Sequence, residues 1–243
     1  PWPRSIRPIR PPRPSAERTA QRSWLLLWLY LTATVLLPGF TPQRMSEPMT
    51  ITHAKAWLAA SLATRGTLPA LTEAHGLAQD ILGTKRTNFF YTGGAHHVVA
   101  RYRLELGELA EAEAAASQAA ECLQTLPILR CHALATHLTI LRQANRLEEA
   151  MALCSQGEGL LQRLGCASYA EVPLRVSIAE TYLAIDDQVA ADAALAAARA
   201  ALSLRMAPMT DDGMRQRFQT AQPEHVRLAE LTADRSHQIL DGT

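Results

Sequence analysis

Apolar and polar positions recur from about Ala54 onward with the period of amphipathic helices. Alanine dominates this part of the chain, glycine and proline are scarce in it, and β-branched or aromatic runs are nearly absent. These features favour helices over sheets. The pattern predicts alternating helices of roughly 14–18 residues between residues 52 and 205, broken by short polar or glycine-containing turns.

Four of these turns share one motif, a residue suited to a left-handed conformation followed two places on by an apolar residue. The pairs, at spacings of 41, 38 and 42 residues, are Gly66 and Leu68, Gly107 and Leu109, Asn145 and Leu147, and Asp187 and Val189. Gly, Asn and Asp suit the residue that ends a helix, and we expect the apolar residue to start the next buried stripe. The repeat predicts four helix-turn-helix hairpins, over residues 52–82, 92–124, 128–164 and 171–205.

A hairpin of this size cannot bury its apolar face alone, so it stacks on its neighbours. Small residues recur at 110–116 and 190–198, where two helices must approach closely. We therefore expect an all-α solenoid over residues 45–206, the alternative being an irregular α-bundle with similar turns. Residues 207–243 are predicted to form a C-terminal capping helix and tail, started by Asp211 and Asp212. Its buried face is expected to hold Met214, Phe218, Val226, Leu228 and Leu231.

The first 44 residues differ from the rest. They open on a Pro- and Arg-rich stretch, and residues 24–37 follow as an uncharged apolar run, shorter than the about 20 residues of a full membrane span. Three interpretations stay open: a membrane anchor, a cleaved signal, or a lead that is unphysiological or belongs to the truncated end of a longer protein. We expect membrane contact only through residues 24–37, and otherwise a cytoplasmic protein.

Charge gives little reason to expect a nucleic-acid partner. The chain has 24 Lys and Arg against 23 Asp and Glu, a net charge of +1. Seven of the arginines and a single acid lie in residues 1–44, so residues 45–243 carry 17 basic and 22 acidic side chains, a net charge of −5. A mildly acidic helical region does not attract a polyanion.

The sequence holds no motif that indicates catalysis. It lacks the glycine-rich loop of a kinase or ATPase, the nucleophile elbow of a hydrolase and the paired histidines of a metal helix. Its cysteines, at positions 122, 131, 154 and 166, form no Cys-x-x-Cys pair, and His132 and His137 have no second cluster beside them. We therefore expect no enzyme activity, no cofactor and no metal.

The segment around Gly107, from Ala100 to Ala112, resembles a tetratricopeptide (TPR) repeat, with the small residue, turn glycine and following apolar residue at that family's offsets. Asn145 to Ala150 is similar to the same turn. The period of about 40 residues is longer than the TPR repeat of about 34. This resembles the longer, degenerate TPRs attached to bacterial signalling proteins, and the resemblance implies a right-handed superhelix.

The C-terminal third, from Glu171 through Leu228, resembles the closing segment of the TPR regions in large bacterial serine/threonine kinases and ATP-binding regulators. In those families this segment ends the chain, behind a catalytic domain. The resemblance implies a non-catalytic regulatory or scaffold region that binds protein or peptide segments.

In TPR folds the first helices of the hairpins line a concave groove that can hold a peptide. Counting back from the turns predicts these groove residues: His97, Arg101, Glu105, Thr139, Arg142, Gln143, Ser177 and Thr181. For each, an ordinary solvated side chain is an equally good interpretation. The alternative function is a small-ligand sensor of an ATP-binding transcriptional regulator. A hydrophobic pocket walled by unsatisfied polar groups would favour the sensor, and a dry, flat groove would favour the scaffold.

Overall fold

The computed structural model describes residues 48–84, 88–165, 168–220 and 222–241. The chain divides into two compact units, residues 1–54 and 55–243. Of the first unit, only residues 48–54, the beginning of a helix, fall in the described ranges. The expected lead over residues 1–44 lies outside the described residues.

The described residues are all-helical and contain no β-strand, which confirms the all-α class. Eight of the helices form successive pairs whose ends lie within four residues of the predicted hairpins. The pairs are α2 (Pro48–Ala63) with α3 (Leu68–Leu82), α4 (Phe89–Glu105) with α5 (Leu109–Cys122), α6 (Pro127–Gln143) with α7 (Leu147–Leu164), and α8 (Glu171–Ala184) with α9 (Gln188–Met206).

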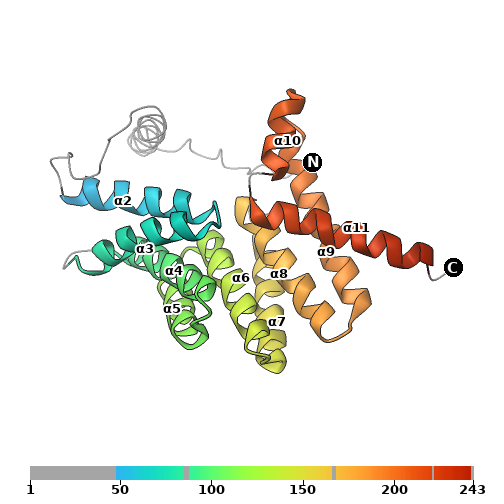
Figure 1. Ribbon diagram of the computed structural model, residues 1–243, viewed down its shortest axis with the longest axis horizontal. Coiled ribbons are helices and arrows are strands. Elements are labelled where there is room, and N and C mark those ends of the chain that lie inside the picture. Colours follow the sequence, from blue (N-terminus) through green and yellow to red (C-terminus); the bar gives the residue numbers. More distant parts are fainter. Residues whose placement is uncertain (1–47, 85–87, 166–167, 221, 242–243) are drawn as a thin grey trace, which may run out of the picture. The chain divides into compact units, whose positions relative to one another are not determined.

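Within residues 55–243 the helices contact one another in a regular order (Figure 1). Helix α6 contacts its own partner α7, the second helix of the previous pair, α5, and the first helices of both neighbouring pairs, α4 and α8. The three first helices α4, α6 and α8, which we call the A helices, therefore lie side by side. This order fits a helical solenoid, in which each hairpin buries its apolar stripe against the next.

The turns between paired helices carry left-handed residues, as predicted at Gly66, Gly107 and Asn145, whose φ angles are 68°, 75° and 56°. The fourth turn corrects the prediction by one position, because Asp186, with φ of 63°, is the left-handed residue. Asp187 instead caps α9, where its carboxylate accepts a hydrogen bond of 3.0 Å from the Ala190 amide. Asp186 thus provides the left-handed turn, and the adjacent Asp187 provides the N-cap of α9.

The apolar residue after each turn is expected to start a buried stripe, but none of the four is itself buried. Val189 is 82% exposed, Leu68 is 42% exposed, and Leu109 and Leu147 are half-buried. After the first three turns a fully buried residue follows three places further on, on the same side of the helix. These residues are Leu71, Ala112 and Ala150.

Small side chains fill the interfaces between neighbouring helices. Ala100 of α4 and Ala112 and Ala116 of α5 are fully buried in one cluster with Ile140 of α6. Gly157 of α7 faces α8, where a Cβ atom would lie 3.3 Å from a methyl group of Leu174. The helices can approach this closely because these positions lack larger side chains.

After α9 the chain forms two helices, α10 (Asp212–Thr220) and α11 (Pro223–Asp241), where the sequence predicted one. The Asp211 carboxylate accepts a hydrogen bond of 2.6 Å from the Met214 amide and so caps α10. Helix α11 packs on α8 and α9, and it buries Leu228 and Leu231 in a cluster with side chains of those helices (Figure 1). Met214 and Val226 are exposed, contrary to expectation, because they lie on the outer sides of their helices.

We expect Gly93→Ala to destabilise the protein by about 1–3 kcal/mol, the cost of overpacking a filled interior. A Cβ atom at Gly93 would lie 2.6 Å from Cγ of the buried Leu123 and 3.0 Å from Cβ of Cys122. Gly94→Ala is the matched control, because its Cβ atom would meet nothing within 4 Å. It should raise stability by up to about 1 kcal/mol through helix propensity. Urea unfolding measures both, and equal effects would contradict the packing of α4 on α5.

Candidate functional site

The A helices present one common face, because residues about one helical turn apart project the same way. On α4 these positions hold Arg101 and Glu105, while α6 contributes Thr139 and α8 contributes Ser177. We call this surface the A-helix face.

The structure brings four of the eight predicted residues together. Arg101, Glu105, Thr139 and Ser177 line one shallow pocket of about 240 Å³ on the A-helix face. Glu105 is exposed, Arg101 and Thr139 are half-buried, and Ser177 is buried. The lining of this pocket combines charged and hydroxyl side chains with apolar ones such as Leu104 and Val176.

The other four predicted residues lie elsewhere. Gln143 is exposed at the end of α6, and His97 lines a second, larger cavity. Arg142 and Thr181 bind each other across the seam between α6 and α8, with 3.4 Å between Nη1 of Arg142 and Oγ1 of Thr181. Their polar groups serve the contact between two helices.

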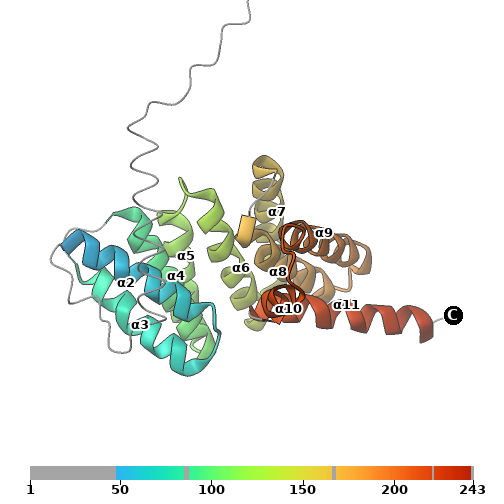
Figure 2. The ribbon, with the colours of Figure 1, turned by 90° about the horizontal axis from the view of Figure 1, so that it is seen from above.

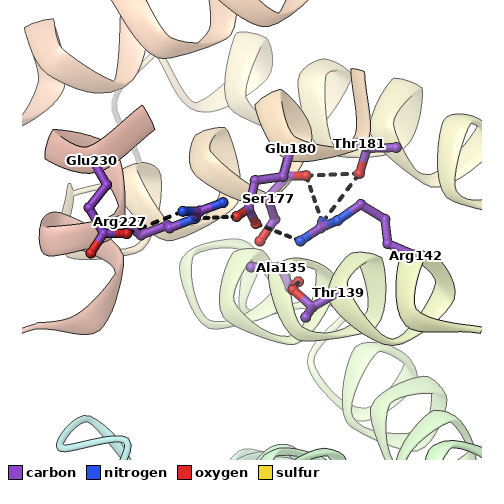
Figure 3. Close-up of polar contacts among 8 residues, drawn as sticks. All are labelled: Ala135, Thr139, Arg142, Ser177, Glu180, Thr181, Arg227 and Glu230. Atoms are coloured by element: carbon purple, nitrogen blue, oxygen red, sulfur yellow. Dashed lines mark hydrogen bonds and ion pairs between the residues drawn. The ribbon is translucent and has the colours of Figure 1, made fainter. Parts of the chain in front are cut away.

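Arg142 and Glu180 form the centre of a polar network that joins three helices (Figure 3). The Arg142 guanidinium donates to the Ser177 carbonyl oxygen at 3.0 Å and to Oε2 of Glu180 at 2.5 Å. The second oxygen of Glu180 accepts a bond of 2.7 Å from Nε of Arg227, which also donates to Glu230 within α11. Burial lowers the pKa of Arg142, and the Glu180 carboxylate opposes that effect. One carboxylate therefore bridges two arginines on different helices.

The beginning of α11 lies on the A-helix face (Figures 1 and 2). Pro223, Glu224 and Arg227 line the same shallow pocket, and Glu224 forms an ion pair with Arg101 at 3.6 Å. A Cβ atom at Gly66, in the turn between α2 and α3, would lie 2.9 Å from Cγ of Pro223. The first turn of α11 thus lies next to that turn and pairs with α4 through Arg101 and with α8 through Glu180.

Sequence reasoning missed the residues of α11 and their partners on the A helices, Glu180 above all. Glu180 lies three residues after the predicted Ser177, so the same helical count would have found it. Nothing local in the sequence indicates that Glu224 and Arg227 reach α4 and α8, because they are separated from their partners by 123 and 47 positions.

A second cavity, of about 290 Å³, lies between α2, α4, the end of α5, α6 and the start of α8. Most of its wall is apolar and comes from alanines and from larger side chains that include Trp57, Phe90 and Val98. At its polar end the lining residues are His97, Arg101, His132, Tyr169 and Glu224. Arg101 and Glu224 line both cavities.

The histidines at this polar end are held in their neutral form. His97 Nε2 lies 3.0 Å from Thr136 Oγ1, within hydrogen-bond distance. His132 lies between the rings of His97 and Tyr169, at centroid distances of 6.0 and 5.2 Å, and its Nε2 atom is buried without a hydrogen-bond partner in the described part of the chain. Burial, aided by the positive charge of Arg101, lowers the pKa of His132 to about 4. Neither imidazole therefore brings a positive charge to this end of the cavity.

Two further findings concern only the residues that the structure describes. No three His, Cys, Asp or Glu side chains among them are grouped so that they could hold a metal ion. None of the described helices is both long enough and apolar enough to cross a bilayer. The apolar run at 24–37 lies outside the described ranges.

Comparisons with known proteins add no relative. The chain matches no protein-family model, and searches of curated proteins and of solved structures return no match.

We expect Glu180→Gln to destabilise the protein by about 1–3 kcal/mol, because it removes the charged partner of a guanidinium that is only 13% exposed. Glu230→Gln is the matched control, since Glu230 pairs with the same Arg227 but is 54% exposed, and should cost less than about 1 kcal/mol. Thermal unfolding followed by circular dichroism compares the two. Similar midpoints for both variants would show that the network does not hold the three helices together.

Proposed function

We propose that this protein is a non-catalytic interaction and regulatory module, built as a right-handed TPR-like solenoid, that binds a protein segment on its A-helix face. The paired helices, the left-handed turn residues and the contacts between successive A helices support the solenoid. The TPR-like offsets around Gly107 support the right-handed superhelix by resemblance.

The observation that carries the proposal is the position of the first turn of α11. The A-helix face already holds a chain segment, through the ion pairs of Arg101 with Glu224 and of Glu180 with Arg227. A shallow polar pocket runs between the two pairs. A surface that binds the protein's own helix by charge and shape has the properties needed to bind a similar segment of another protein.

The ion pairs define the chemistry of the proposed partner. Arg101 favours an acidic side chain and Glu180 a basic one, and in α11 these are three residues apart, about one helical turn. The partner segment is therefore a helix with an acidic residue followed one turn later by a basic residue. The net charge of −5 over residues 45–243 argues against nucleic acid as the partner.

The setting in which the module works is proposed from resemblance alone. The segment from Glu171 through Leu228 resembles the end of the TPR regions of bacterial kinases and ATP-binding regulators. On that basis we propose that the module regulates a bacterial signalling protein linked to a kinase or ATPase.

A small-ligand sensor is a second candidate, and one specific observation favours it. The cavity of about 290 Å³ has mostly apolar walls, and the His132 Nε2 atom at its polar end is buried without a partner among the described residues. This is the feature that distinguishes a sensor from a scaffold. The two candidates are compatible, because Arg101 and Glu224 border both the cavity and the A-helix face.

Selection of short random peptides on the immobilised full chain tests the proposed function. We expect enrichment of peptides with an acidic residue and a basic residue one turn later, because these would replace Glu224 and Arg227. Arg101→Glu should abolish their binding in fluorescence anisotropy titrations. Arg163→Glu, at an exposed position on α7, is the charge-matched control and should leave binding unchanged. If no peptide is enriched, or if the enriched peptides bind Arg101→Glu as tightly as the parent chain, the A-helix face is not a peptide site.

A further inference from the structure

We infer that the cavity of about 290 Å³ is a binding site for a small amphipathic carboxylate, with its apolar chain among the alanines of α2 and α4 and its carboxylate at Arg101. This inference rests on the second candidate function, the ligand sensor. It does not depend on peptide binding at the A-helix face.

The volume of the cavity limits the size of the ligand. The cavity of about 290 Å³ lies near the lower end of the range of about 300–1,000 Å³ typical of ligand pockets. A short-chain organic acid fits this volume.

The walls of the cavity favour a ligand with an apolar chain. Alanines of α2 and α4 line the cavity together with Phe90, Val98, Leu123 and Leu129, and these side chains offer no hydrogen bonds to a ligand. Their apolar surface gains from excluding water when an apolar body covers it. A strongly polar molecule would lose its hydration against these walls without compensation.

The polar end selects an anion. Arg101 is 19% exposed, and the carboxylate that faces it, Glu224, stands 3.6 Å away, longer than a charge-assisted hydrogen bond. The guanidinium has five N–H donors in a fixed fork that matches a carboxylate, so it can bind a second one. A ligand cation would be repelled by Arg101, and an alcohol would gain less from it.

His132 lines the same end of the cavity without adding a charge to it. Its Nε2 atom is buried without a hydrogen-bond partner among the described residues. Burial, aided by Arg101, lowers the pKa of His132 to about 4, so the imidazole is neutral at pH 7. The charged contact for the carboxylate is therefore Arg101.

Octanoate, with ten atoms other than hydrogen, is the probe, and isothermal titration calorimetry on the full chain is the measurement. Three compounds serve as controls. Acetate has the carboxylate but no octyl chain, octan-1-ol has the chain but no charge, and octylammonium has the chain with a positive charge. We expect saturable binding of one octanoate per chain. The three control compounds should bind about tenfold more weakly or worse, since each loses either apolar burial or a charge-assisted contact.

Four variants locate the site. Gly94→Leu should abolish octanoate binding, because Gly94 lines the cavity and its Cβ atom would meet nothing within 4 Å, so the leucine fills the space without displacing a neighbour. Gly76→Leu is the matched control at an exposed glycine of α3 that also has no neighbour within 4 Å, and it should bind normally. Arg101→Gln should weaken binding about tenfold. Glu224→Gln should strengthen it, because it removes the carboxylate that competes for Arg101.

The outcomes separate this inference from the proposed function. Loss of octanoate binding in Gly94→Leu with retained peptide binding supports a ligand site distinct from the A-helix face. If the folded parent chain does not bind octanoate, the inference is wrong, whether or not the chain binds peptides. Equal binding of octanoate and octan-1-ol also overturns the inference, because the carboxylate would then contribute nothing to affinity. Unchanged octanoate binding in Gly94→Leu overturns it as well, because the ligand would then bind outside this cavity.

Discussion

The structure depends on one constraint, that no hairpin of two alanine-rich helices can bury its apolar stripe by itself. The stripe is covered only when the next hairpin approaches closely, and small residues such as Ala100, Ala112 and Ala116 make that approach possible. Helix α6 shows the result, because it contacts helices of the pairs on both sides. Helix α11 covers the fourth pair, α8 with α9, through Leu228 and Leu231. The contacts of α6 with α4 and α8 place the A helices side by side, and the first turn of α11 lies on the surface that they form.

Local signals in the sequence predicted the helices and most of the turns. Gly66, Gly107 and Asn145 are left-handed as expected, because Gly and Asn tolerate positive φ and stand between two amphipathic runs. The fourth turn differed by one residue, since adjacent Asp186 and Asp187 can each fill either role and only the path of the chain selects between them. The error at Val189 has a similar cause, because hydrophobicity alone does not tell the outward first turn of a helix from the buried stripe.

The candidate site was only partly predictable. Counting along helices placed Arg101, Glu105, Thr139 and Ser177 on one face, and the structure gathers them in one pocket. Counting along helices could not show that the end of the chain returns to this face, because the ion pair of Arg101 with Glu224 joins residues 123 positions apart. Nor could it show the second cavity, since the histidines and alanines around it are separately ordinary core residues. The cavity is a space left where several helices meet, and local sequence patterns do not indicate such a space.

The position of the first turn of α11 on the A-helix face is the central claim, and an engineered disulfide measures it directly. A Cβ atom at Gly66 would lie 3.9 Å from Cβ of Pro223, close to the mean of about 3.8 Å in disulfides. In the double variant Gly66→Cys, Pro223→Cys, oxidation followed by peptide mass mapping should yield a link between positions 66 and 223, with the helical circular dichroism retained. Gly66 has a φ of 68°, so a cysteine there costs about 1–2 kcal/mol, and the thiols are compared only in a variant whose circular dichroism matches that of the parent chain. If both thiols of that folded variant stay free, or pair only with the native cysteines, α11 does not begin where this account places it.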